Sequence, residues 1–168
     1  KVAEDQIEIT EGVNQFVWDQ NYPPAERADG MILWTGGIGA AKAAPGKYTA
    51  KIKYGNDSTE IAFVIKPNPV YQATEADYDA QVSFLLSVRD KFNEVQKAIK
   101  NIRTIRTQIT DLNSRVDAKS NKDLKQFADS VSKQLTAIEE ALYQTKAKSG
   151  QDVLNFPIRL NDKISGLY

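Results

Sequence analysis

The sequence predicts an α+β chain of two domains, an Ig-like β-sandwich over residues 1–70 and a helical bundle over residues 71–168. Three observations predict it. The first 70 residues hold seven of the nine glycines and five of the six prolines, whereas residues 71–149 hold neither. Residues 47–65 alternate apolar and polar side chains, which is the period of a strand. Residues 78–116 place apolar side chains every three or four positions, which is the period of an α-helix.

The first domain is predicted from short alternating runs separated by turn residues. "KYTAKIKY" and "TEIAFVI" flank "GNDS", whose residues tolerate positive φ, so a hairpin is expected there. Upstream, "QIEIT", "NQFVWDQ" and "GMILW" are predicted as further strands. Several short strands with turns between them are typical of a β-sandwich. Because this segment is short for such a fold, one edge is expected to be missing or covered by the second domain.

The second domain is predicted to begin with a long helix over about residues 74–117. Thr74 suits the N-cap, and Asp77 stands at the capping-box position. Pro67 and Pro69 separate this helix from the last strand, because neither has the N–H group that a strand ladder needs. The mean spacing of the apolar residues is close to that of a heptad repeat. These residues are Tyr78, Val82, Leu85, Val88, Phe92, Val95, Ile99, Ile102, Ile105, Ile109, Leu112 and Val116.

Two more helices are expected after the break "DAKSNKD". The second helix, over about residues 121–147, is predicted to be the antiparallel neighbour of the first because the loop between them is short. Its apolar face holds Leu124, Phe127, Val131, Leu135, Ile138 and Leu142. A two-helix hairpin buries little surface, so a third short helix is expected over about residues 157–167, with Pro157 near its first turn.

The composition excludes several classes of function. Lys and Arg number 22, as do Asp and Glu, so the net charge of zero gives no global attraction to nucleic acid or to an anionic membrane. The chain has no cysteine and no histidine, which excludes disulfides, thiolate chemistry and histidine-based catalysis or metal binding. No apolar run is long enough to span a membrane. Because the sequence begins with Lys1 and shows no signal peptide, it is expected to be a fragment or a processed product.

Charged residues and the glycine-rich segment give few signs of chemistry. "WTGGIGAAKAAPG" leads into a strand and not into a helix N-terminus that could hold phosphate, so it is interpreted as a strand connection. A glycosidase needs a carboxylate pair, but the acids are interpreted as solvated surface charge. They are Asp19, Glu26, Glu75, Asp77, Asp79, Glu139 and Glu140. The basic stripe is interpreted as a solvated helix face or as the partner of acids on the neighbouring helix. It consists of Lys97, Lys100, Arg103 and Arg106. No cofactor, metal site or nucleic-acid interface is predicted.

The aromatic residues of the first domain offer candidates for ligand binding. Trp18, Tyr22 and Trp34 could together form a platform on which a sugar ring stacks. Trp18 alternates with Phe16, which favours the core for both. Trp34 closes the strand "MILW" beside glycines and is therefore the better surface candidate. Trp34 and Tyr22 are the two ligand-binding residues that the sequence proposes.

Longer motifs resemble a known family. "FVWDQNYPPA", "GMILWTGG" and "APGKYTAKI" are followed by "TEADYDAQVSFLLSVRDKFNEVQKAIKNIRTIR" and "LNFPIRLNDKISGL". Together they resemble the region after the β-propeller in bacterial sortilin-like, BNR-repeat proteins, which are often described as glycosyl hydrolases. The resemblance covers nearly the whole chain.

The resemblance implies a large bacterial protein that is exported to the periplasm, the cell surface or the medium. It places a β-propeller upstream, and that propeller would carry any hydrolase site. The Asp-box signature of such propellers is absent from this chain, so no catalytic residue is carried over. The strand half is also similar to Ig-like modules of the flagellar hook-capping kind, which are structural.

These observations together predict a non-catalytic C-terminal module. It would support or orient the upstream propeller, or mediate assembly, including self-association through its helices. Two alternatives stay open. One is an accessory domain that binds carbohydrate or peptide through Trp34 and Tyr22, and the other is a hydrolase with an unrecognised carboxylate pair.

Overall fold

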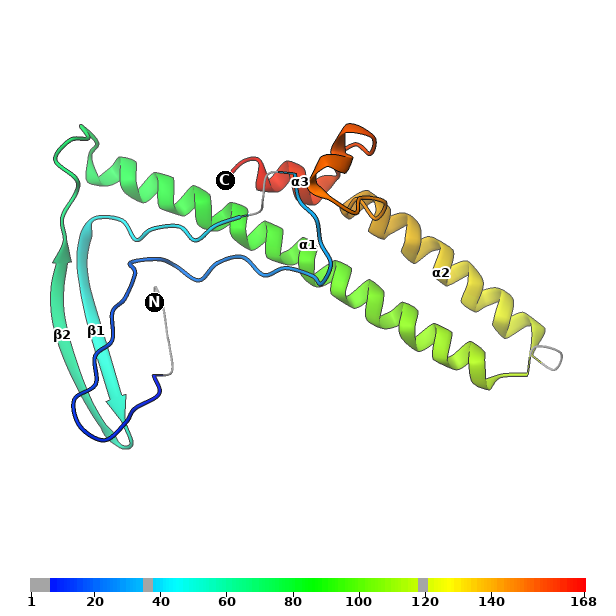
Figure 1. The fold of residues 1–168 in the computed structure, drawn as a ribbon, viewed down its shortest axis with the longest axis horizontal. Helices are drawn as coiled ribbons and strands as arrows, with labels where there is room; N and C mark the ends of the chain where they lie inside the picture. The colour runs from blue at the N-terminus through cyan, green and yellow to red at the C-terminus, as the bar shows by residue number, and fades with distance from the viewer. Residues whose placement is uncertain (1–6, 35–37, 118–120) are drawn as a thin grey trace. The chain divides into compact units, whose positions relative to one another are not determined.

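A computed structural model describes residues 7–34, 38–117 and 121–168 (Figure 1). Its elements in chain order are β1 Gly46–Tyr54, β2 Asp57–Ile65, α1 Glu75–Arg115, α2 Lys122–Leu142, the 3₁₀ helix η1 Gly150–Leu154 and α3 Leu160–Ser165. The chain divides into two compact units. Unit 1 holds the described residues up to Pro24 together with Ala40–Ser87, and unit 2 holds those of Ala25–Gly39 and Val88–Tyr168. The domain boundary at residue 70 stays a prediction.

The sheet of unit 1 is the hairpin that the alternating pattern predicts. β1 and β2 pair antiparallel from Gly46 opposite Ile65 to Tyr54 opposite Asp57. The intervening turn has two residues, and its first, Gly55, has a φ of 56°. A two-residue turn with positive φ matches the right-handed twist of the strands that it joins, so local sequence is sufficient to specify this hairpin.

The predicted Ig-like β-sandwich is wrong. Within the described residues, the sheet has two strands, and no second sheet covers either face. Both faces of the hairpin are therefore largely open to solvent. The exposed apolar side chains on it are Ile52, Tyr54, Ile61 and Val64, each more than half exposed.

The upstream segments fail to become strands because their backbones are interrupted. "NQFVWDQ" ends at Gln20, whose φ of 63° does not fit an extended strand. Pro23 and Pro24 follow and lack the N–H groups that a ladder requires. What remains is a single bridge between Asn21 and Lys42. The part of "QIEIT" that the structure describes, residues 7–10, is not in a strand either.

A small aromatic cluster packs on the hairpin. The rings of Tyr48 and Phe63 are stacked with centroids 5.8 Å apart, and Trp18 lies at 6.1 Å and 6.2 Å from them. The core position expected for Trp18 is thus found in part, since its side chain is half-buried. Phe16 is 52% exposed, so the core position expected for it is wrong.

Helix α1 begins with the predicted capping box. The backbone N–H of Thr74 donates to Asp77 Oδ2 at 2.9 Å, and the N–H of Asp77 donates back to Thr74 Oγ1 at 3.3 Å. These two bonds satisfy N–H groups that the first turn of a helix leaves without partners. The start of the long helix is therefore specified locally.

The core of unit 2 forms on the middle of α1. Phe92 and Ile99 are fully buried there, and Val88, Val95 and Ile102 are nearly so. The first four of these helix residues in the sequence, Val88 to Ile99, pack against Ala28, Leu33 and Ile38, against Tyr143, and against Ile164 of α3. The predicted seam of twelve apolar residues is thus buried over only five of them, because only this stretch of the helix is covered.

The predicted apolar face of α2 is found only in part: Val131, Leu135 and Leu142 are half-buried, and Leu142 packs against the core. Ala128 and Glu139 are the buried residues of this helix, whereas Phe127 is 69% exposed and Ile138 is 51% exposed. The predicted face contained Phe127 and Ile138 as core residues, and this assignment is wrong. Glu139, which follows Ile138, is paired with Arg103 and Arg106 of α1, and Ala128, which follows Phe127, is buried.

The helical bundle is also corrected. Unit 2 has one long helix and one shorter helix, and α3 has only six residues where a helix over about residues 157–167 was predicted. α2 ends at Leu142, before the expected residue 147, and the chain continues into η1. In the described part of the chain, no helix is long and apolar enough to cross a membrane.

Candidate functional site

An extended segment of unit 2, residues 25–34, is held by side chains instead of by a strand ladder. We call it the strap. The backbone N–H of Glu26 donates to Asn93 Oδ1 at 2.8 Å, and that of Ala28 donates to Gln96 Oε1 at 3.0 Å. Asn93 and Gln96 lie one turn apart on α1, so they bind alternate residues of the strap. "GMILW" within it, predicted as a strand, is therefore not one.

The second half of the strap is bound by the C-cap residue of α2 and by α3. Tyr143 donates its hydroxyl to the carbonyl of Gly30 at 3.1 Å, and the N–H of Trp34 donates to Asp162 Oδ1 at 2.7 Å. Asp162 is 3% exposed. A buried carboxylate that accepts a backbone N–H is a strong, charge-assisted hydrogen bond. The strap is thus joined to three separate helical segments of unit 2.

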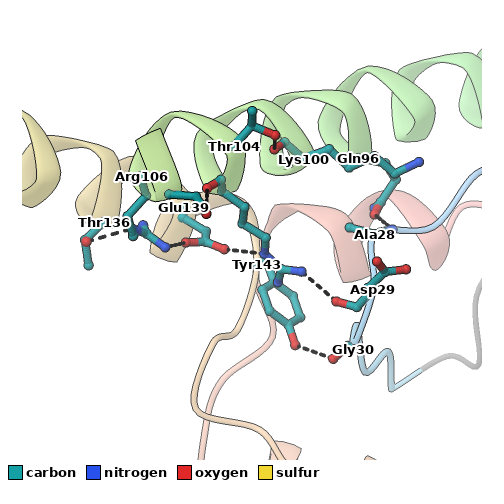
Figure 2. Close-up of polar contacts among 12 residues, drawn as sticks. Ala28, Asp29, Gly30, Gln96, Lys100, Thr104, Arg106, Thr136, Glu139 and Tyr143 are labelled. Carbon is teal, nitrogen blue, oxygen red and sulfur yellow. Dashed lines mark hydrogen bonds and ion pairs between the residues drawn. The ribbon is translucent and has the colours of Figure 1, made fainter. Parts of the chain in front are cut away.

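Glu139 is the centre of the polar cluster beside the strap (Figure 2). Its Oε1 accepts from Arg103 Nε at 2.9 Å, and its Oε2 accepts from Arg106 Nη1 at 2.7 Å. The carboxylate side chain is 5% exposed, whereas each arginine is about one third exposed. Arg103 also donates to the carbonyl of Asp29 at 2.6 Å, so one guanidinium joins α1, α2 and the strap.

Tyr143 adds a second contact to this cluster. The guanidinium carbon of Arg103 lies 5.7 Å from the centroid of the Tyr143 ring, which is a cation–π distance. The ring of Tyr143 therefore contacts Arg103, and its hydroxyl binds the strap at Gly30. Glu139, Arg103 and Tyr143 form a connected polar group at the junction of α1, α2 and the strap.

The electrostatics of the cluster favour an ionised Glu139. Burial raises the pKa of its carboxyl, but the hydrogen bonds and positive charges of Arg103 and Arg106 outweigh burial and lower the pKa below its ordinary value. The carboxylate therefore stays charged at neutral pH. A catalytic acid needs the opposite arrangement, in which the pKa is raised toward the working pH.

A surface cavity of about 560 Å³ lies beside this cluster. Its wall includes Arg103, Arg106, Glu139, Tyr143 and Lys148. Arg103, Glu139 and Tyr143 are engaged with one another or with the strap, and Arg106 binds Glu139 and Thr136 while its Nε has no hydrogen-bond partner. Within the described residues, no group of three or more acids could hold a metal ion. Both buried carboxylates of the described chain, Glu139 and Asp162, serve as acceptors in contacts that hold the fold.

The two ligand-binding residues proposed from the sequence belong to different units. Trp34 is 52% exposed and lies in unit 2, at the end of the strap. Tyr22 is half-buried in unit 1, where its N–H donates to the carbonyl of Ala41 at 2.8 Å. The structure does not bring them together within one unit. The cavity that Trp34 lines has a volume of about 10 Å³, which is too small to enclose a sugar ring.

The basic stripe of α1 is partly explained by the structure. Arg103 and Arg106 pair with an acid of the neighbouring helix, as one of its two interpretations proposed, and Lys100 pairs with Glu26 of the strap at 2.9 Å. The interpretation of Glu139 as solvated charge is wrong. Sequence spacing alone could not show this, because adjacent Glu140 has the same type and is exposed.

Gln96, Tyr143 and Asp162 were not among the candidates predicted from the sequence. Gln96 offered a signal, since it lies in the apolar stripe between Val95 and Ile99 and is fully buried. A polar residue at such a position needs a buried partner. No sequence signal pointed to Asp162, because it lies in a short polar run near the end of the chain.

Replacing Tyr143 with phenylalanine tests the contact between α2 and the strap. The variant keeps the ring under Arg103 and loses only the hydroxyl bond to Gly30. We expect the free energy of unfolding, measured with urea, to fall by about 1 kcal/mol. Tyr54→Phe is the control, because Tyr54 is 71% exposed on the hairpin. Equal losses in the two variants would contradict this role of the hydroxyl.

No protein-family model, curated protein or solved structure matches this chain. The resemblance to sortilin-like, BNR-repeat proteins therefore rests on the sequence motifs alone.

Proposed function

We propose that this chain is a non-catalytic structural and interaction module. The observation that carries the proposal is the cluster around Glu139. The arginine side chains that could act on a ligand, Arg103 and Arg106, are bound to this buried carboxylate, and Arg103 is also bound to the strap. Side chains that are held by such ion pairs and hydrogen bonds stabilise an arrangement of helices and are poorly placed to bind or activate a substrate.

The motifs that resemble BNR-repeat proteins support the same proposal. In "AIKNIRTIR" the two arginines are those that bind Glu139, and in "LNDKI" the Asp162 carboxylate binds the strap. Asn161 beside it is fully buried. The residues that carry the resemblance thus hold this fold together. We therefore propose a larger exported bacterial protein in which this module supports an upstream β-propeller.

A carbohydrate- or peptide-binding role is the second candidate, and the exposure of Trp34 favours it. Half of this large aromatic side chain is open to solvent, and its backbone is held firmly by Asp162. A rigidly held, exposed indole can stack on a sugar ring or on an extended peptide. Tyr22 cannot be added to this site from the structure, since it belongs to unit 1.

A glycan array and a peptide-library screen of the 168-residue chain separate the two candidates. The Trp34→Ala variant is run beside it, and Tyr54→Ala is the matched control because it removes an equally accessible aromatic ring. We expect no specific binding by any of the three proteins. Binding that is lost in Trp34→Ala and kept in Tyr54→Ala would overturn the non-catalytic support role and assign an accessory binding domain.

A further inference from the structure

The strap contains an Asp-Gly pair, Asp29–Gly30, which is the only such pair in the sequence. In an Asp-Gly pair the backbone nitrogen of the glycine can attack the side-chain carboxyl carbon of the aspartate, because glycine has no Cβ that hinders the approach. The product is a five-membered succinimide ring, which water can open in two ways. One opening restores aspartate. The other gives isoaspartate, in which the main chain runs through the former side chain.

Both reacting groups of this pair are accessible in the structure. Asp29 and Gly30 are exposed, and both line the cavity of about 560 Å³. Among the described residues, neither the carboxylate of Asp29 nor the N–H of Gly30 has a hydrogen-bond or ion-pair partner. In most of a folded chain the backbone N–H is held in a helix or a sheet, which keeps the nitrogen from reaching a side chain. At Gly30 this protection is missing.

The fold itself requires glycine after Asp29. Gly30 has a φ of 67°, in the left-handed region that residues with a Cβ rarely adopt. It lies in a turn that is closed by the N–H of Met31, which donates to the carbonyl of Ala28 at 3.3 Å. The reactive pair therefore belongs to the turn of the strap, and its glycine cannot be replaced without strain.

Arg103 lies where it can promote the attack. Its Nη1 donates to the carbonyl oxygen of Asp29 at 2.6 Å, and this carbonyl belongs to the same peptide group as the nitrogen of Gly30. When that nitrogen gives up its proton, negative charge moves onto the carbonyl oxygen. A hydrogen bond from a cation to this oxygen stabilises the charge, as the donors of an oxyanion hole do. The contact that holds the strap therefore also activates the attacking nitrogen.

We propose that Asp29–Gly30 is a site of isoaspartate formation in the folded chain, and that Arg103 promotes the reaction. A bond forms between the nitrogen of Gly30 and Cγ of Asp29, while the hydroxyl of the protonated carboxyl and the proton of the N–H leave as one water molecule. Water then cleaves the bond between this nitrogen and the α-carbonyl carbon of Asp29. That carbon becomes a free carboxylate, and no other reactant is needed. The proposal does not rest on the support role proposed above.

Isomerisation changes how the strap is held. The oxygen that Arg103 binds becomes part of a carboxylate, and the main chain gains one methylene group before Gly30. The hydroxyl of Tyr143 donates to the carbonyl of Gly30 at 3.1 Å (Figure 2). Asp162 accepts from the N–H of Trp34 at 2.7 Å. A displacement by one C–C bond, about 1.5 Å, is enough to break either hydrogen bond. The second half of the strap is therefore expected to loosen.

Peptide mapping of the folded 168-residue chain after several weeks in mildly acidic buffer tests the proposal. Trypsin releases residues 28–42 as one peptide with Asp29 as its single aspartate, so a second peak of equal mass reports isoaspartate there. We expect isoaspartate to form at Asp29 at least about fivefold faster than at Asp57, which is also exposed but precedes Ser58 in the ladder of β2. Asp29→Glu should abolish the second peak, because its ring would have six members. No isoaspartate at Asp29, or equal rates at the two sites, would overturn the proposal.

Arg103→Lys tests the part that the arginine plays in the reaction. Lysine lacks the planar group that binds Glu139 and the carbonyl of Asp29 together, so isomerisation should slow. We expect a slowing of about fivefold, less than the 100-fold or more of a buried oxyanion hole, because Arg103 is 34% exposed. Glu139→Gln is the matched control, since it disturbs the same cluster and leaves Arg103 on the strap. Loosening of the strap alone would speed the reaction in both variants. A rate in Arg103→Lys that equals or exceeds the wild-type rate, or the same slowing in both variants, would contradict the role of Arg103.

Discussion

Replacing Glu139 with glutamine is expected to lower the free energy of unfolding by about 2 kcal/mol. The substitution leaves Arg103 and Arg106 beside a neutral amide in a site where the wild-type carboxylate is 5% exposed. Breaking a fully buried ion pair costs about 3–5 kcal/mol. The smaller value is expected here because both guanidinium groups remain about one third exposed and keep part of their hydration.

The adjacent Glu140 provides a control of the same chemistry. It is exposed on α2, so Glu140→Gln should change the urea unfolding free energy by less than about 0.5 kcal/mol. If both variants lose the same stability, the structural role of the Glu139 cluster is wrong. A loss confined to Glu139→Gln would show that the cluster holds the two helices and the strap together.

The pH dependence of this difference follows from the lowered pKa of Glu139. A carboxyl whose pKa is lower in the folded state contributes stability above its unfolded value, here 4.5, and loses it as pH falls through the folded value. The difference between wild type and Glu139→Gln should therefore be constant from pH 7 to pH 5. It should shrink below about pH 4.5. A difference that grows under acid would show that the pKa is raised instead.

Phe92→Ala is expected to have the largest effect, a loss of about 3–5 kcal/mol. Phe92 has no exposed surface and packs against Leu33, Ile38 and Val88. Removing a buried aromatic ring loses its transfer free energy and leaves a cavity that rigid neighbours fill only in part. Because Leu33 and Ile38 come from the segment before α1, the loss should also loosen that segment in hydrogen exchange.

Phe84 offers a matched control on the same helix. Phe84 is 52% exposed, so Phe84→Ala should cost less than about 1 kcal/mol in the same urea titration. A cost for Phe84→Ala equal to that for Phe92→Ala would mean that the core of the long helix is not where the structure places it.

Several elements were predictable from the sequence because short-range interactions specify them. The hairpin follows from alternation around Gly55, and the start of α1 follows from the Thr74–Asp77 capping box. The length of α1, Glu75–Arg115, follows from a run without glycine or proline. Each of these features depends on residues that are at most a few positions apart, or on the absence of helix breakers.

The candidate site was predictable only in part. Arg103 and Arg106 stood out as a basic stripe, and pairing with acids of the next helix was one interpretation of it. Which acid would pair with them was not visible, because Glu139 and Glu140 are neighbours of the same type. The choice depends on the rotation of α2 about its axis. A difference of one residue turns a side chain by about 100°, enough to exchange a buried carboxylate for an exposed one.

The sequence by itself determined the local conformations, the lack of histidine and cysteine chemistry, and the balance of charge. Only the tertiary structure decided how these pieces associate. Alternation specifies that a segment can be a strand, but a sandwich also requires neighbouring strands. The positive φ of Gln20 and the missing N–H groups of Pro23 and Pro24 prevent the upstream segment from supplying one. The strap found its partners in side chains such as Asn93 and Asp162, far away in sequence. Local rules cannot assign such partners, because long-range pairing depends on the positions of all the other elements.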